Sequence, residues 1–571
     1  MRLERSEIRG RERAGPGARS VPVLMALILL ALAVPDRAAA QYEKPPSAAA
    51  YGLEGVTVVR ADGSTMEDVN IVVRDGRIVA LGDDVGMPAS ARVLEGDSLR
   101  VYPGMIDAAG SAEYELPEPD SSAGEVGSWN PPRDVQRFRP HLRVADHLSA
   151  PGSWVADLRE AGIVAAAVHP DDGPAPGQSA LLQFRKDAGT PRGLVLDPSL
   201  GGVLTLQASP GVYPGTLFGV MAFHRQQFRN ARHRASLTTA YDEDPAGLRT
   251  PTWDADYAAL SSMLSGETQV FFRADGPENI RRALDLADRG GFDPVIVGGR
   301  GAGQVTELLA DRGAAVLLST DYPTPERWDP DAGEGVREDT LPPEVQREKD
   351  RLEEAYRDAA RLQEEGVTFA LTTGDGDADL REGVRRAIEY GLPESAALRA
   401  VTSAPAGLLG RPELAEVREG LSANFVVADG PLFEEETSLL YTFVDGRPEV
   451  MYDPGGEPSE PPAVDVTGTW DLEIEMSQGS FEGTMELQQD GSTVTGSFSA
   501  SGQAPPLTLE DGTVSGSSLD LTLSASAGGE TIEITLGGTV EGEEASGTGS
   551  GPFGSFTWEA TRTSSPGREA E

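Results

Sequence analysis

Five polar side chains each follow or end a short apolar run, at positions suited to catalysis or ligand binding. They are His169, Arg273, Asp275, Asp321 and Asp375. In barrels of alternating strands and helices, the carboxyl ends of the strands meet on one face, and active sites are built there. All five residues are therefore candidate site residues.

His169 and Asp375 are the candidate catalytic residues. An imidazole can act as a general base or a metal ligand, and a buried aspartate with a raised pKa can act as a general base. Both have structural alternatives, because a histidine after an apolar strand is often simply hydrogen-bonded, and Asp375 can instead pair with Arg273.

Arg273, Asp275 and Asp321 are the candidate substrate-binding residues. A guanidinium binds a carboxylate through two parallel hydrogen bonds, so Arg273 could hold a substrate carboxylate. The alternative is a salt bridge from Arg273 to Asp275 or Asp321. The run Gly-Gly-Arg-Gly-Ala-Gly at 298–303 either holds an anion at a helix N-terminus or forms a tight turn between a strand and a helix.

The middle of the chain alternates buried strands with helices. Apolar strand patterns occur at 163–168, 269–275, 294–298, 314–321 and 368–375. Helical patterns occur at 153–162, 214–232, 277–290, 303–312, 344–365, 379–390 and 394–403. This alternation predicts a parallel α/β architecture closed into a (β/α)8 barrel over residues 103–412.

Both ends of the barrel segment are β-rich. Residues 41–102 carry hairpin turns at Asp62-Gly63 and Asp75-Gly76, which is the turn chemistry of antiparallel strands. Together with residues 413–452 they are expected to form one small β-sandwich. A linker at 453–464 then leads to an all-β domain at 465–562, predicted to be an up-and-down barrel or a sandwich, and a disordered tail at 563–571.

Composition points to an exported protein. Residues 1–20 carry six arginines, residues 21–34 are apolar, and three alanines precede Gln41, which predicts a signal peptide over residues 1–40. The chain has no cysteine and a formal net charge of −44. Such a charge disfavours nucleic acid and anionic membranes. We expect a secreted or periplasmic protein without a stable membrane anchor, whose partner is a small-molecule ligand or substrate; its oligomeric state stays open.

Three stretches together resemble a known family. They are Val-Tyr-Pro-Gly-Met-Ile-Asp at 101–107, Glu-Gly-Leu-Ser-Ala-Asn-Phe-Val-Val-Ala-Asp at 419–429 and Tyr-Thr-Phe-Val-Asp-Gly-Arg at 441–447. In this order they resemble the amidohydrolase superfamily, particularly its imidazolonepropionase-like branch, over residues 51–451. The resemblance implies a (β/α)8 barrel flanked by a composite β-sandwich. Separately, Gly468-Thr-Trp470 is similar to the Gly-X-Trp opening of lipocalin-type barrels.

The resemblance also implies a divalent metal such as zinc, held by histidines at the strand ends. Here Ala109 and Ser111 stand at the first two histidine positions, Arg273 or Ala274 at the fifth-strand position, and Gly298-Gly299 at the sixth. Asp375 stands at or beside the position of the family's last-strand aspartate. The metal site is therefore expected to be lost.

Two functions remain as hypotheses. The first is an exported hydrolase acting on carbon–nitrogen bonds other than peptide bonds. The second is a catalytically inactive binding protein with the barrel fold, whose appended β domain serves recognition. A third option is metal-free or mononuclear acid–base chemistry by His169 and the aspartates.

Overall fold

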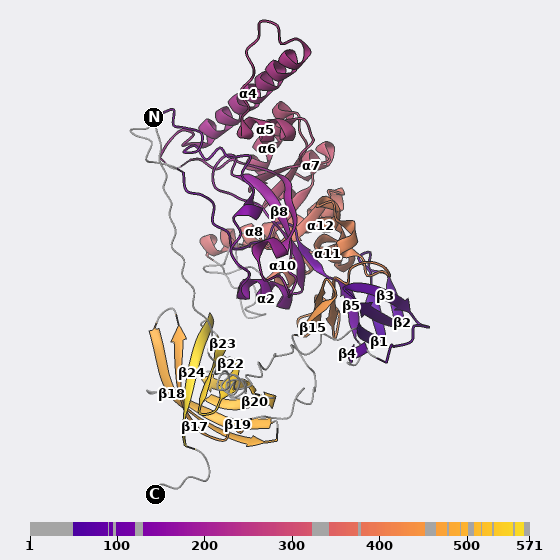
Figure 1. Cartoon of the computed structure of the whole chain (residues 1–571), viewed down its shortest axis with the longest axis vertical. Coiled ribbons are helices and arrows are strands. Elements are labelled where there is room, and N and C mark those ends of the chain that lie inside the picture. The colour runs from indigo at the N-terminus through magenta and orange to yellow at the C-terminus, as the bar shows by residue number, and fades with distance from the viewer. Residues whose placement is uncertain are drawn as a thin grey trace, which may run out of the picture.

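A computed structural model describes most of the chain, and its strands form three sheets (Figure 1). The described residues are 50–89, 91–94, 99–119, 129–209, 211–322, 342–374, 379–450, 464–476, 479–491, 493–500, 507–515, 517–527, 530–551 and 554–564. The predicted signal peptide, the predicted linker as far as residue 463 and the candidate Asp375 lie outside them.

The central sheet is the barrel. Its strands lie in the order β13-β12-β11-β10-β9-β8-β7-β6. Their bounds are β6 (Met105–Asp107), β7 (Ile163–Val168), β8 (Gly177–Gln183), β9 (Val195–Thr205), β10 (Val270–Ala274), β11 (Pro294–Gly298), β12 (Val316–Ser319) and β13 (Phe369–Thr372). Strands β7, β12 and β13 are buried along their whole length, as expected for strands covered on both faces.

One strand of this sheet breaks the predicted pattern. β8 pairs antiparallel with both β7 and β9, whereas the other neighbouring strands of the sheet pair in parallel. Only residues 169–176 separate β7 from β8, and a parallel crossover needs a dozen residues or more. The expectation of eight parallel strand–helix units is therefore wrong at β8.

The first and last strands meet through a side chain. Asp107 ends β6, is fully buried, and accepts hydrogen bonds from the backbone nitrogen and the hydroxyl of Thr373, which directly follows β13. These bonds connect the two ends of the strand order and bring the ends of β6 and β13 together.

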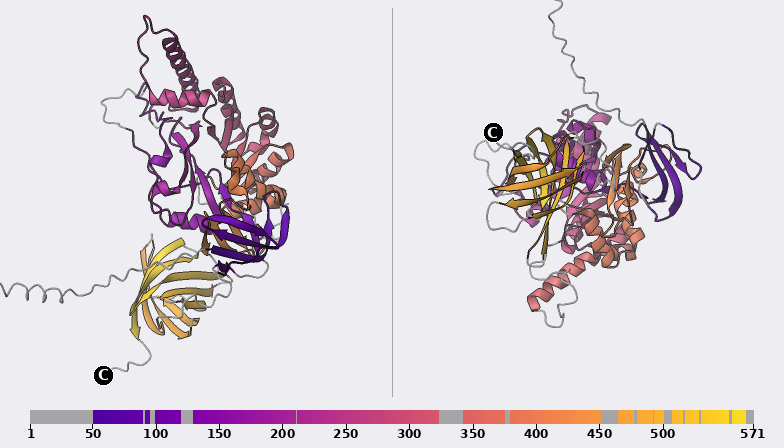
Figure 2. Two further views of the ribbon diagram at one scale, coloured as in Figure 1. Left: turned by 45° about the vertical axis from the view of Figure 1, so that its right-hand side comes forward. Right: turned by 90° about the horizontal axis from the view of Figure 1, so that it is seen from below.

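Helices surround the barrel strands (Figures 1 and 2). The α-helices are α2 (Ser153–Glu160), α3 (Pro191–Leu194), α4 (Leu217–Glu243), α5 (Ala255–Leu264), α6 (Pro277–Gly290), α7 (Thr306–Arg312), α8 (Pro343–Tyr356), α9 (Asp358–Glu365), α10 (Leu380–Glu389), α11 (Glu394–Val401) and α12 (Ser403–Leu408). The short 3-10 helices are η1 (Val144–Asp146), η2 (Ala302–Gln304) and η5 (Pro412–Ala415). No helix among the described residues is long and apolar enough to cross a membrane.

Helix α6 illustrates how the sequence sets an element. Pro277 supplies a preset φ at the first helical position, and Gly291 ends the helix at φ 69, in the left-handed region that glycine tolerates. Ile280, Ala283 and Leu284 are buried at helical spacing, so one face of α6 packs on the sheet.

Both ends of the barrel segment join in a second sheet. Its order is β16-β15-β14-β5-β1-β2-β3, with β4 also pairing with β1. The bounds are β1 (Ala50–Val59), β2 (Thr65–Arg74), β3 (Arg77–Gly82), β4 (Ala91–Leu94), β5 (Arg100–Pro103), β14 (Phe425–Ala428), β15 (Leu439–Val444) and β16 (Arg447–Val450). The β5–β14 ladder pairs Tyr102 with Val426, so strands from both ends of the barrel segment share one sheet; the sandwich and its domain bounds stay a prediction.

The third sheet is a closed antiparallel barrel of consecutive strands. Its strands are β17 (Gly468–Met476), β18 (Gly479–Asp490), β19 (Thr493–Ala500), β20 (Leu507–Ser515), β21 (Ser518–Ala527), β22 (Glu530–Glu541), β23 (Glu544–Gly551) and β24 (Gly554–Ser564). Trp470 and Trp558 are buried in its core. Of the two predicted alternatives, an up-and-down barrel or a sandwich, the strand order is that of the up-and-down barrel. Strand β24 ends at Ser564, two residues beyond the predicted end of the domain at 562. The likeness to lipocalins stays a prediction.

Candidate functional site

The carboxyl ends of the barrel strands surround a cavity of about 320 Å³, which we call the mouth pocket. Ala109 follows β6, Thr205 ends β9, and Gly374 lies just beyond β13. Its other lining residues are Asp171, Leu206, Gln207, Arg273, Ala274, Asp275, Asn279, Val297, Gly298, Arg300, Ser319 and Asp321. Its volume is at the lower end of the range for small-molecule sites.

The three candidate substrate-binding residues all line this pocket. Arg273 comes from β10, Asp275 follows β10, and Asp321 follows β12. These residues were proposed because they lie at strand ends. The fold places the three strand ends around one pocket, so Arg273, Asp275 and Asp321 lie close together.

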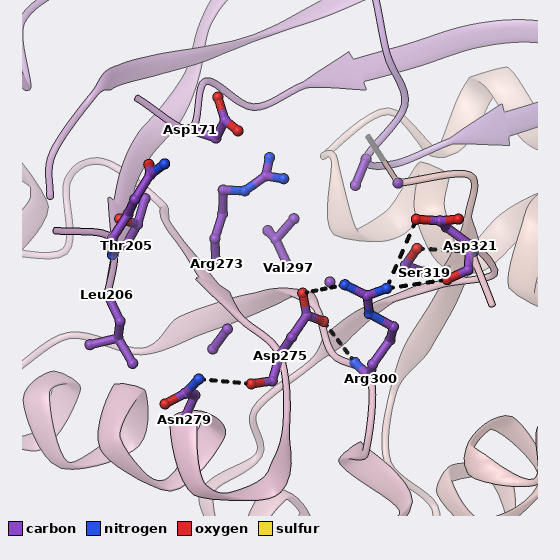
Figure 3. Close-up of a pocket in the computed structure, with 15 residues that line it drawn as sticks. Asp171, Thr205, Leu206, Arg273, Asp275, Asn279, Val297, Arg300, Ser319 and Asp321 are labelled. Atoms are coloured by element: carbon purple, nitrogen blue, oxygen red, sulfur yellow. Dashed lines mark hydrogen bonds and ion pairs between the residues drawn. The ribbon is translucent and has the colours of Figure 1, made fainter. Parts of the chain in front are cut away.

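The guanidinium of Arg273 points into the pocket beside Asp171 (Figure 3). Its Nη1 donates a hydrogen bond of 2.9 Å to the backbone carbonyl of His169. Burial lowers the pKa of Arg273, while the negative charge of Asp171 acts in the opposite direction. The pocket wall therefore contains a half-buried positive charge in a fixed position.

Arg300, which sequence reasoning missed, links the two predicted aspartates. Its Nη2 lies 3.2 Å from Asp275 Oδ2, and its Nη1 lies 3.9 Å from Asp321 Oδ2. Burial lowers the pKa of Arg300, but the hydrogen bond and charge of Asp275 outweigh that effect and raise it. Asp275 and Asp321 are thus both ion-paired with Arg300 (Figure 3).

The glycine-rich run at 298–303 presents its backbone to an internal anion. Asp358, which opens α9, accepts hydrogen bonds from the backbone nitrogens of Gly301 at 2.6 Å and Gly303 at 3.0 Å. Asp358 is almost completely buried, and burial raises its pKa to about 6 despite these bonds. The run therefore forms a turn anchored by the chain's own carboxylate, which holds Arg300 at the pocket edge.

His169 lies outside the lining of the mouth pocket. Its Nδ1 is 2.7 Å from the Ser179 hydroxyl and its Nε2 is 2.8 Å from the Ala108 carbonyl oxygen. Burial lowers its pKa to about 3, so the ring is neutral at physiological pH. With both ring nitrogens bonded, His169 contributes to the site through its backbone carbonyl, which accepts from Arg273.

The buried Asp107 was also missed as a functional candidate. Burial raises its pKa to about 6, against the hydrogen bonds from Thr373 and Ala109 that lower it. The sequence does contain a pattern that could have identified Asp107, because this aspartate directly follows the apolar residues Met105 and Ile106 at the end of a strand. Asp375, the remaining catalytic candidate, lies outside the described residues.

The residues at the expected metal-ligand positions do not fit a divalent metal. Ala109 and Gly298 line the pocket but have no side-chain atom that could bind a metal. At the fifth-strand position, Arg273 carries a positive charge and Ala274 has no side-chain atom that could bind a metal, and Ser111 lines a different cavity. Within the described ranges, no group of three or more histidine, aspartate or glutamate side chains is arranged to hold a metal ion.

The barrel, with the mouth pocket at the carboxyl ends of its strands and a second sheet built from both ends of the barrel segment, defines a TIM-barrel fold. An amidohydrolase from Thermotoga maritima MSB8 is similar in structure, with a TM-score of 0.56 and 17% identity, covering 70% of this chain and 99% of its own. At this identity the likeness establishes the fold alone.

Two further solved structures are similar over 70% of this chain. An adenosine deaminase from Xanthomonas campestris with bound zinc has a TM-score of 0.39 at 15% identity over 92% of its own chain. A mutant atrazine chlorohydrolase from Arthrobacter aurescens TC1, complexed with zinc and atraton, has a TM-score of 0.40 at 16% identity over 95% of its chain. No protein-family model matches the sequence, and no curated protein is similar to it.

Proposed function

We propose that this chain is an exported binding protein whose mouth pocket takes a small molecule carrying a carboxylate, without a metal. The observation that carries the proposal is Arg273, a guanidinium at the end of β10 in the pocket wall. A guanidinium matches the geometry of a carboxylate and binds it through two hydrogen bonds. The predicted signal peptide at 1–40 supports export.

The other charged groups narrow the ligand. Asp171 and Asp321 also line the pocket, so a ligand with an amino group beside its carboxylate would meet opposite charges at both ends. Polar side chains such as Gln207 and Asn279 provide hydrogen-bonding groups along the wall. Amino acids and small dicarboxylates are therefore the first compounds to test.

Calorimetric titration of the mature protein with a panel of amino acids, dicarboxylates and uncharged amides tests this proposal. We expect a carboxylate to bind, and Arg273→Gln to weaken binding on the order of 10- to 100-fold, since a hydrogen bond to a charged group contributes roughly 1.5–3 kcal/mol. Arg281→Gln is the matched control, because Arg281 pairs with Glu278 on helix α6 and does not line the pocket. Equal weakening by both variants, or binding of the amides alone, would contradict the proposal.

The fold favours a second function, hydrolysis of a carbon–nitrogen bond, because the similar structure from Thermotoga maritima is an amidohydrolase. Under that alternative, an amide substrate is turned over and Asp375→Asn abolishes turnover in a folded protein. Under the binding proposal, carboxylate binding survives both His169→Ala and Asp375→Ala, apart from any loss of stability.

A further inference from the structure

Helix α4 extends well beyond the barrel it packs on (Figures 1 and 2). Its last buried residue is Ala231. Residues 232–240 are exposed, Tyr241 is half-buried, and residues 242–250 are exposed again. The outer three turns of α4 therefore lack the packing that normally stabilises a helix in a protein.

One exposed stripe runs along this outer part. Arg229, His233, Leu237, Ala240 and Glu243 are all exposed and follow one another at spacings of three or four residues, which places them on one side of the helix. Leu237, near the middle of the stripe, is 46% exposed. Single exposed apolar side chains are common on protein surfaces, so Leu237 alone does not indicate a binding partner. The charges along the helix are the evidence for which partner binds.

The charges along α4 are strongly segregated. Residues 225–234 include four arginines and one histidine and no acidic residue, whereas residues 242–244 are Asp-Glu-Asp. Acidic side chains at the C-terminal end of a helix are unfavourable, since the helix dipole is negative there. A positive group from another molecule would relieve this repulsion.

We propose that the stripe pairs antiparallel with the same stripe of a second copy of this chain. A two-fold axis beside Ser236 and Leu237 places Arg229 of each copy opposite the acidic end of α4 in the other, and His233 opposite Ala240. Such an isologous contact is self-complementary, because the same residues meet twice. Ser236 and Ala240 are small and let the two helices approach closely across the axis.

The contact involves one helix face from each copy, so it predicts a reversible dimer. Sedimentation velocity of the full mature chain over a wide concentration range measures it directly. We expect a monomer–dimer equilibrium. Arg229→Glu and Glu243→Arg should each abolish the dimer, since each places two like-charged pairs across the axis.

Mixing the two variants gives the decisive result. In the mixed dimer, the glutamate introduced by Arg229→Glu in one copy faces the arginine introduced by Glu243→Arg in the other. On the opposite side of the axis the native Arg229 and Glu243 still face each other. Both contacts then join opposite charges, so dimerisation should return.

Glu365→Arg is the matched control, because Glu365 is also an exposed glutamate that ends a helix, and this variant should still dimerise. Glu243→Arg places a positive charge at a helix C-terminus and should not weaken the fold, which circular dichroism and thermal unfolding can verify. A wild-type monomer at every concentration, a dimer that survives both charge reversals, or a mixture that stays monomeric would each overturn the proposal.

Discussion

At the level of single residues, two buried titratable side chains, Asp107 and His169, lie next to residues that line the mouth pocket. Asp107 and His169 are both fully or almost fully buried, and burial disfavours the charged form of each. The Asp107 carboxylate accepts a hydrogen bond from the Thr373 hydroxyl. Both ring nitrogens of His169 are hydrogen-bonded, one with Ser179 and the other with the Ala108 carbonyl. Both residues bond to lining residues, Asp107 to the backbone of Ala109 and the His169 carbonyl to Arg273, and burial of Asp107 should be visible in the pH dependence of stability.

The buried carboxyl of Asp107 should make the protein less stable as the pH rises from 4 to 6. Its folded-state pKa of about 6 exceeds the unfolded value of about 3.9, so the folded state binds the proton more tightly. The resulting stabilisation is present in full below pH ~4 and is lost as the pH rises through 6. The difference of roughly two pKa units corresponds to up to about 3 kcal/mol.

Urea unfolding of the wild type and of Asp107→Asn at several pH values measures this effect. The free energy of unfolding of the variant, relative to the wild type, should increase by up to about 3 kcal/mol between pH 4 and pH 7. The same substitution at the exposed Asp311 should change the pH profile little. Parallel profiles for Asp107→Asn and the wild type would show that the carboxyl is not buried as described.

At the scale of elements, the turn after β11 sets the shape of the pocket. Gly298 ends β11 at φ 92, and an added Cβ would lie 2.8 Å from Asp275 Oδ1. Asp275 holds Arg300 through the ion pair at 3.2 Å. A side chain at position 298 would therefore displace the aspartate as well as strain the backbone.

Gly298→Ala and Gly313→Ala separate these two effects. Gly313 also has a positive φ, of 61, but an added Cβ there has no atom within 4 Å. Both variants should lose about 1–2 kcal/mol of stability from backbone strain. Only Gly298→Ala should also weaken ligand binding, by several-fold, as measured by calorimetric titration. Equal binding by both variants would mean that the Asp275–Arg300 pair does not shape the site.

Element patterns explain what the sequence could and could not predict. The strands at 163–168 and 294–298 were predicted with the observed bounds, because glycine or proline flanks each apolar run. The antiparallel direction of β8 was not predicted, because an apolar run has the same pattern whether its strand is parallel or antiparallel to its neighbours. The single helix predicted at 344–365 is divided into α8 and α9 at Arg357, and helical spacing alone does not reveal such a break.

The site was predictable only where it lies at strand ends. Arg273, Asp275 and Asp321 directly follow or end strands and do line the pocket. Arg300 and Asp171 also line it, but they lie in loops, whose conformation depends on distant contacts such as that from Asp358 to Gly301. His169 was a candidate by position, yet its bonds to Ser179 and Ala108 could not be read from the chain.

At the scale of the whole molecule, three sheets with separate strand ladders share one chain. An amidohydrolase is similar in fold over 70% of this chain and 99% of its own, and the C-terminal barrel of eight strands forms a hydrophobic core of its own. Fold likeness does not transfer chemistry. The chemistry of the pocket depends instead on the residues at the strand ends, where Ala109, Arg273 and Gly298 line it.

The metal content of the purified protein is the sharpest test of a metal-free mouth pocket. Plasma mass spectrometry after dialysis in metal-free buffer, followed by dialysis against zinc and removal of the unbound ion, measures retained metal. We predict far less than one equivalent, because Arg273 brings a positive charge to the pocket wall and Ala109 and Gly298, which also line the pocket, supply no donor atom. One equivalent of zinc, retained by the wild type and lost in Asp375→Asn, would contradict a metal-free pocket and indicate a rebuilt metal centre.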